Sequence, residues 1–218
     1  MAPHQPEPGS RPSTPAEAWA VLKAGNARFM AGEQAHPNQD IHSRDRLAVQ
    51  QMPFAVFFGC ADSRVAAELI FDQGLGDLFV VRTAGHVVDP SVLGSLEFGV
   101  EVLDAPLIVV LGHDSCGAIS ATLNAVESGQ MPGGFLRDIV ERVTPSVLTA
   151  RRIGRLTTDE VEREHVRHTT RLLAERSTTI RDRIESGRLA IVGAEYKLAH
   201  GEASLVTVVG DVGEQPSV

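Results

Sequence analysis

The sequence predicts an α/β fold with a mostly parallel sheet, because short apolar runs alternate with helical segments along most of its 218 residues. Four of these runs are continuous, as expected for strands that are covered on both faces; they span 54–58, 78–81, 107–111 and 189–192. A fifth run at 204–209 is expected to form an antiparallel strand at the sheet edge. We therefore expect about four parallel strands plus an antiparallel edge strand, flanked by helices and preceded by an N-terminal helical arm.

The arm begins with a Ser-Thr-Pro capping signal, which predicts a helix over 15–31 that ends near Gly32. Its apolar residues Trp19, Leu22 and Phe29 recur at helical spacing, and we expect this face to be exposed on the chain. Further helical segments are expected at 42–50, 64–71, 91–103, 117–128, 135–150 and 158–186.

Composition limits the class of protein. The formal net charge is -8 and the isoelectric point is about 5.5, which argues against nucleic acid as a partner. No apolar run is long enough to cross a membrane. Residues 1–14 are Pro-rich and polar and lack the features of a secretory signal, so we expect a disordered tail before a single domain over 15–218. That domain divides into the helical arm, 15–50, and the sheet core, 54–209. These features indicate a cytoplasmic protein with reduced thiols.

Residues able to bind a metal follow two of the predicted strands. The first strand leads into Cys60 and the third into His113 and Cys116, and these are the only two cysteines of the chain. In open α/β sheets, ligands bind beyond the carboxyl ends of the strands, so the three side chains converge if the two strands are neighbours. We expect His113 and Cys116 to point the same way on the first turn of a helix. Two thiolates and an imidazole favour zinc, and a fourth open position is typical of a catalytic site.

Other interpretations of these residues remain open at this point. A cysteine at a strand end is most often a small core residue, and His113 could simply bind a backbone group. A metal-free Cys–His nucleophile is a third possibility. Asp62 and Arg64 alternate along a segment expected to be extended, where they could form a surface ion pair of little energetic value. Beside zinc, Arg64 could instead hold Asp62 ionised through a bidentate contact.

The long polar helix expected at 158–186 carries two histidines, His165 and His168. Because most of its residues are charged or polar, we expect both histidines to be solvated and to play no part in the site.

Three short motifs resemble the signature of the β-class carbonic anhydrases, namely CADSR at 60–64, RTAGH at 82–86 and HDSCG at 113–117. Their order and separation agree with that family, and the resemblance extends from about Ala16 to the strand near Val208. The chain is most similar to the actinobacterial branch. The resemblance implies zinc-dependent, reversible hydration of carbon dioxide to bicarbonate and a proton through zinc-bound hydroxide.

The resemblance also implies the roles of the site residues. One Zn²⁺ per chain would be bound by Cys60, His113 and Cys116, with Asp62 and Arg64 as a catalytic dyad. Asp62 is two residues from Cys60 and is therefore also a candidate fourth metal ligand, one that could leave or take the open position as the pH changes.

Three further positions would contact substrate by the same resemblance. They are Gln51, which would reach the site of a partner subunit, the pocket aromatic Phe79, and Gly117, whose backbone N–H would hold the bound anion. The family also implies a homodimer or homotetramer in which the helical arm wraps around a partner. A hydrolase of carbon disulfide or carbonyl sulfide on the same scaffold is an alternative function. A non-catalytic zinc sensor is another, which would have no need of the Asp62–Arg64 pair.

Overall fold

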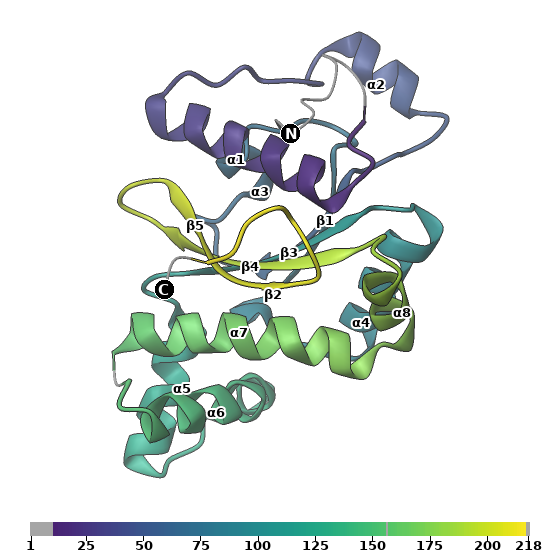
Figure 1. Cartoon of the computed structure of the whole chain (residues 1–218). Coiled ribbons are helices and arrows are strands. Elements are labelled where there is room, and N and C mark those ends of the chain that lie inside the picture. Colours follow the sequence, from purple (N-terminus) through teal and green to yellow (C-terminus); the bar gives the residue numbers. More distant parts are fainter. Residues whose placement is uncertain (1–10, 156, 217–218) are drawn as a thin grey trace.

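Figure 1 shows a computed structural model of the chain, which describes residues 11–155 and 157–216. Its centre is a five-stranded sheet with the strand order β2-β1-β3-β4-β5. The four parallel strands are β1 (Ala55–Cys60), β2 (Leu78–Thr83), β3 (Leu107–His113) and β4 (Ala190–Lys197). The fifth strand, β5 (Glu202–Val209), pairs with β4 in the antiparallel sense at one edge. The predicted fold class is confirmed.

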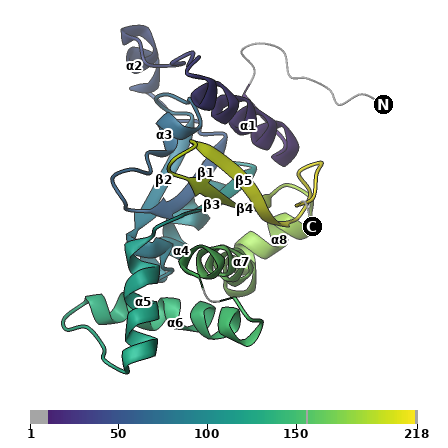
Figure 2. The same ribbon diagram turned by 90° about the vertical axis from the view of Figure 1, so that its left-hand side faces the viewer.

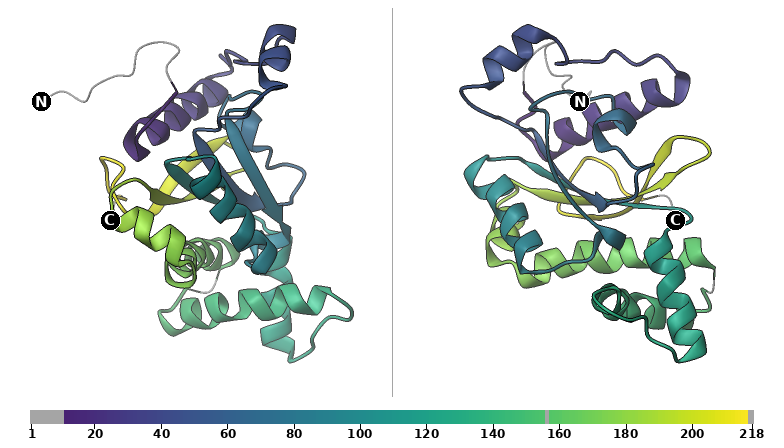
Figure 3. Two further views of the ribbon diagram at one scale, coloured as in Figure 1. Left: turned by 90° about the vertical axis from the view of Figure 1, so that its right-hand side faces the viewer. Right: turned by 180° about the vertical axis from the view of Figure 1, so that it is seen from behind.

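Helices cover both faces of the sheet, as the side and rear views show (Figures 2 and 3). One face carries α1 (Pro15–Ala31), α2 (Ile41–Leu47) and α3 (Ala67–Ile70). The other carries α4 (Pro90–Glu97), α7 (Thr158–Arg176) and α8 (Thr178–Glu185). Beyond α7 lie α5 (Gly117–Ser128) and α6 (Leu136–Arg152), so α7 is packed between the sheet and an outer helical layer.

The first helix is stabilised at both ends as the sequence predicts. Thr14 and Glu17 form a capping box, and Gly32 ends the helix in the left-handed region at φ +71°. The expectation that its apolar face is exposed is wrong, because Trp19 and Leu22 are each only 1% exposed and pack in the core of their own chain. The physical reason is that this sheet face would otherwise be open to water, and α1 covers it.

Several helix boundaries differ from the prediction for local reasons. The segment 64–71 forms only the short α3, since the residues before it form the turn that carries the candidate site. The segment 91–103 begins as α4 and continues as one π-helical stretch, η2 (Phe98–Val102). The segment 158–186 divides at Ser177, which is extended and whose hydroxyl accepts the Ile180 N–H to cap α8.

Most of the predicted disordered tail, residues 1–10, lies outside the described residues. Within them, Arg11 donates hydrogen bonds to the carbonyl oxygens of Pro53, Leu103 and Asp104. None of the helices in the described ranges is both long enough and apolar enough to cross a membrane.

Candidate metal centre

The candidate site lies where the direction of the strand order changes. From β1 the chain proceeds to β2 on one side, whereas β3 lies on the other side and pairs directly with β1, with Gly59 opposite Leu111. Cys60 is the last residue of β1 and His113 the last residue of β3. Both side chains therefore leave the sheet at the switch point where α/β folds bind their ligands. The condition for convergence, that the two strands are neighbours, is therefore met.

Cys60, His113 and Cys116 form a buried group whose ligand atoms all lie within 4.8 Å of one another. The His113 Nδ1 is 2.8 Å from the Asp114 carbonyl oxygen, which can only accept, so Nδ1 carries the ring proton. Nε2 is thereby left as a lone-pair donor, and it is buried without a hydrogen-bond partner among the described residues. An orphaned imidazole nitrogen beside two sulfurs, with its tautomer set by the opposite nitrogen, fits a zinc ion.

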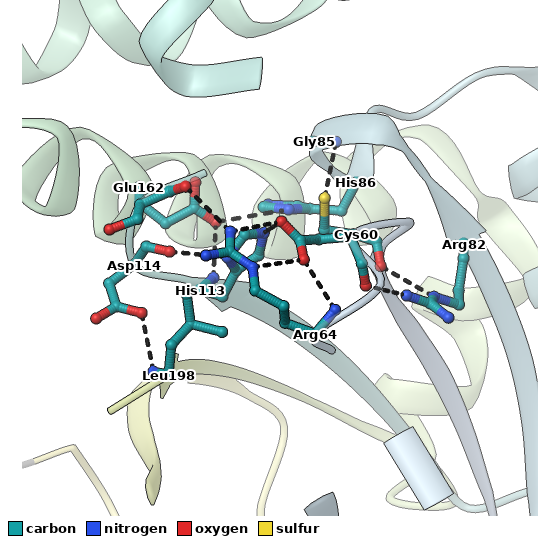
Figure 4. A network of polar contacts seen from close by, with 11 residues as sticks. Cys60, Arg64, Arg82, Gly85, His86, His113, Asp114, Glu162 and Leu198 are labelled. Atoms are coloured by element: carbon teal, nitrogen blue, oxygen red, sulfur yellow. Dashed lines mark hydrogen bonds and ion pairs between the residues drawn. The ribbon is translucent and has the colours of Figure 1, made fainter. Parts of the chain in front are cut away.

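The local backbone that joins His113 to Cys116 differs from the expected helical turn. Asp114 and Ser115 form a turn with Ser115 at φ +54°, and Cys116 is the N-cap of α5 rather than a residue inside it. The turn is fastened to the end of β4, because the Asp114 carboxylate accepts the Leu198 N–H at 2.9 Å (Figure 4). A strand end, a tight turn and a helix cap thus bring the two ligands together.

The two thiols lie close enough to shift each other's pKa. A hydrogen bond from Cys116 lowers the pKa of Cys60 to about 4, although burial opposes this shift. The same hydrogen bond, together with burial, raises the pKa of Cys116. Both cysteines bind metals as thiolates, so a bound dication would favour loss of the proton from each sulfur.

Asp62 and Arg64 form the bidentate pair that the sequence suggested. Arg64 Nε and Nη2 lie 2.9 and 2.7 Å from the two carboxylate oxygens, and the Arg64 backbone N–H also donates to Asp62. These bonds hold the pKa of Asp62 well below its usual range. The segment is a turn rather than extended chain, since the Val65 N–H donates to the Asp62 carbonyl.

The pair points at the metal-binding atoms. Asp62 Oδ2 is 3.9 Å from His113 Nε2, and Arg64 Nη2 reaches the Ser115 carbonyl at 3.5 Å (Figure 4). The Arg64 side chain is 52% exposed, so the ion pair adds little to stability and its value lies in orienting Asp62.

A buried carboxyl group behind the ligands was missed by sequence reasoning. Glu162 on α7 is completely buried and accepts the His113 backbone N–H at 3.2 Å. Burial raises its pKa to about 8. A Cβ atom on Gly112 would lie 2.3 Å from Glu162 Oε1, which explains why glycine precedes His113. His86 lies beside Glu162 at 3.7 Å and is completely buried.

The prediction that His165 is solvated is wrong. It is 2% exposed, with Nδ1 at 2.8 Å from Ser146 Oγ and Nε2 at 2.9 Å from the Gly85 carbonyl. One signal in the sequence could have revealed its burial. His165 follows the apolar residue Val161 by four positions, so both lie on the same face of the helix, and an apolar residue indicates that this face is buried. The expectation for His168 is only partly met, since its side chain is half-buried.

The remaining predicted site residues do not all lie near Cys60 within one chain. Gln51 is exposed and precedes β1. Phe79 on β2 lies opposite Val56, four residues before Cys60, which places Phe79 about 13 Å along the strand from the level of Cys60. Gly117 is the exposed first residue of α5. A cavity of about 170 Å³ opens beside it and is lined by Ala84, Ala118, Ala121, Pro132, Leu136, Ile139 and Val140.

Fold and site together define an α/β protein with a buried Cys–His–Cys group whose atoms suit one zinc ion. A family model described as carbonic anhydrase matches residues 55–203. The chain is 58% identical to Carbonic anhydrase 2 of Mycobacterium tuberculosis over 203 residues, which is 93% of this chain and 98% of that protein. It is also 58% identical to a carbonic anhydrase of Mycolicibacterium smegmatis over 202 residues, with the same coverage.

Solved structures show the same fold. A tetrameric β-carbonic anhydrase from Sordaria macrospora superposes with a TM-score of 0.69 at 24% identity, over 86% of this chain and 95% of that one. This chain therefore belongs to the carbonic anhydrase family, in its β class. The resemblance to the actinobacterial branch is confirmed.

Proposed function

We propose that this chain is a zinc-dependent carbonic anhydrase, a lyase that catalyses the reversible hydration of carbon dioxide to bicarbonate and a proton. The observation that carries the proposal is the convergence of Cys60, His113 and Cys116 beside an ionised, oriented Asp62. The test is a stopped-flow hydration assay on protein of measured zinc content, beside assays with carbon disulfide and carbonyl sulfide. If either sulfur compound is turned over faster than carbon dioxide, the protein is instead a hydrolase of carbon disulfide or carbonyl sulfide.

The roles of the residues follow from their chemistry. Cys60, His113 and Cys116 would hold the ion. When bound there, zinc would supply the Lewis acidity that lowers the pKa of water to about 7 and so provides a nucleophile near neutral pH. Asp62 has no proton to donate, because its pKa is depressed, so it can only accept a hydrogen bond and thereby orient the nucleophile. Arg64 keeps the Asp62 carboxylate in the ionised, oriented state.

We propose that the substrate pocket is completed by a second copy of the chain. Phe79 lies about 13 Å along its strand from the level of Cys60, and Gln51 precedes β1, whose far end carries Cys60, which supports a contribution from a partner in a dimer or tetramer. In this arrangement Phe79 forms an apolar wall for carbon dioxide and Gln51 a polar contact. The Gly117 N–H, at the exposed start of α5, would bind the anionic product.

We also propose that residues 15–218 act as a single domain and that the protein is cytoplasmic. Both cysteines are free and buried within the site. Thiols stay reduced in the cytosol, and Cys60 and Cys116 bind a metal only in the reduced state, which supports this location.

Asp62 is on Arg64 in this structure, and a metal bound by Cys60, His113 and Cys116 would offer it a second partner at the open coordination position. Its lowered pKa keeps it ionised from below pH 4 upward, so its own charge does not change between pH 6 and 9. Hydroxide becomes more abundant over that range and competes for the open position. We therefore expect Asp62 to move toward the metal at acidic pH, and activity to rise steeply in the slightly alkaline range.

X-ray absorption at pH 6 and pH 9, with a pH–rate profile, tests this expectation. A metal environment that is the same at both pH values, with Asp62 always on Arg64, would exclude the movement.

A further inference from the structure

We propose that His165 is a positioning residue for the metal site: by binding the Gly85 carbonyl it holds Gly85 in the conformation that directs the backbone N–H of the same residue at the Cys60 sulfur, and so sets how much charge this ligand gives the metal. The inference rests on the proposed function to the extent that Cys60 binds the metal. It concerns a residue on α7, outside the three signature motifs, which touches neither metal nor substrate.

The contacts form a continuous chain from the outer helical layer to the ligand. Ser146 Oγ on α6 is 2.8 Å from His165 Nδ1, and His165 Nε2 is 2.9 Å from the Gly85 carbonyl oxygen. The Gly85 N–H then donates to Cys60 Sγ at 3.3 Å. Ser146 and His165 are buried at 1% and 2% exposure, so water does not compete with these bonds. Figure 4 shows the last of these contacts.

The direction of each bond is determined by chemistry. A carbonyl oxygen can only accept, so His165 carries its proton on Nε2, and Nδ1 must then accept the Ser146 hydroxyl proton. Burial lowers the pKa of His165 to about 4, so the ring is neutral over the working range and keeps this tautomer. His165 therefore supplies a permanent hydrogen bond to the turn.

The turn needs such support because its backbone is unusual. Gly85 has φ +63° and His86 has φ +39°, two successive residues in the left-handed region. A Cβ atom at Gly85 would lie 2.6 Å from the Ala118 Cβ, so no other residue fits without a shift. Strained backbone of this kind persists where its surroundings hold it in place. The bond from His165 holds the Gly85–His86 peptide, and the left-handed conformation of Gly85 then places the preceding peptide, so that the Gly85 N–H faces Cys60.

A hydrogen bond to a ligating thiolate withdraws electron density from the sulfur. Such partners of ligands tune a metal site, and their removal typically costs about 10–100-fold in metal affinity or activity. His165 acts one bond further away, so we expect an effect near the lower end of that range.

The test uses the full chain loaded with Co²⁺ in place of zinc, because the sulfur-to-cobalt charge-transfer band reports the electron density on the thiolates. In His165→Leu we expect this band to move to lower energy and zinc affinity to fall about 10-fold. His165→Gln, whose amide can place an N–H close to the position of Nε2, should restore the wild-type band. His168→Leu, on the same helix and half-buried, is the matched control and should leave the band in place.

An unmoved cobalt band in a folded His165→Leu protein would overturn the proposal and leave His165 a purely structural role. If that variant does not fold, Ser146→Ala replaces it. This variant keeps the ring but loses the hydroxyl that holds Nδ1 and so orients the ring, and it should shift the band in the same direction by a smaller amount. An unmoved cobalt band in the folded Ser146→Ala protein would also overturn the proposal. Absence of any thiolate band in the wild-type protein would instead refute Cys60 and Cys116 as ligands, and with them the proposed function.

Discussion

Cys60→Ser, His113→Ala and Cys116→Ser are each expected to lose zinc and nearly all carbon dioxide hydration. A serine hydroxyl is a hard, protonated oxygen and a poor substitute for a thiolate. Alanine at 113 removes the imidazole nitrogen that is buried without a hydrogen-bond partner in the part of the chain that the structure describes. The loss should exceed the about 10–100-fold that changes around metal ligands cost, since a ligand itself is removed.

Zinc content per chain and stopped-flow hydration rates measure this effect. Ser63→Ala is the matched control, because this exposed residue lies within the same motif and should keep both zinc and activity. A ligand variant that retains one zinc per chain would remove that residue from the ligand set.

Trp19→Ala is expected to lower the free energy of unfolding by about 3–5 kcal/mol. Trp19 is 1% exposed in the core of its own chain, and its indole N–H donates to Glu214. A loss of that size is a large part of the roughly 5–15 kcal/mol that stabilises a typical domain. Deleting residues 1–35 should for the same reason give insoluble or unfolded protein, and not an active monomer.

Denaturant unfolding of the variant measures the change. Met30→Ala is the control on the same helix, since Met30 is 49% exposed and its replacement should change stability by no more than about 0.5 kcal/mol. Unchanged unfolding of Trp19→Ala, together with dissociation of an oligomer, would show that the helix serves the partner subunit and not its own core.

The ligand set could be predicted from the sequence because its geometry depends on a local rule. Cys60 and His113 each end an apolar strand, and the ends of neighbouring parallel strands meet at one edge of the sheet. The expected helical turn between His113 and Cys116 was wrong, because β3 runs as far as His113 and leaves only a two-residue turn before the helix cap. The spacing of His113 and Cys116 is compatible with either backbone conformation, a helical turn or a tight turn before a helix cap, since both bring the two side chains together.

The residues behind the ligands could not be predicted in this way, because their burial depends on how whole helices pack. Charged side chains surround His165 and Glu162 in the sequence, yet α7 is packed between the sheet and the α5–α6 layer. The extension of β4 was missed for a similar reason. Glu195 looks like the end of an apolar run, but it is completely buried and paired with Arg163 at 3.1 Å and Lys197 at 2.9 Å.

Reconstitution of the metal-free chain with zinc tests the central claim most directly. Protein freed of metal under reducing conditions would receive increasing amounts of Zn²⁺, and carbon dioxide hydration would be followed by stopped flow at each addition. We predict that activity rises in proportion to zinc and reaches a plateau at one ion per chain, while the number of titratable thiols falls from two to none. Hydration by the metal-free chain, or one bound zinc per chain with both thiols still reactive and no hydration, would contradict the account.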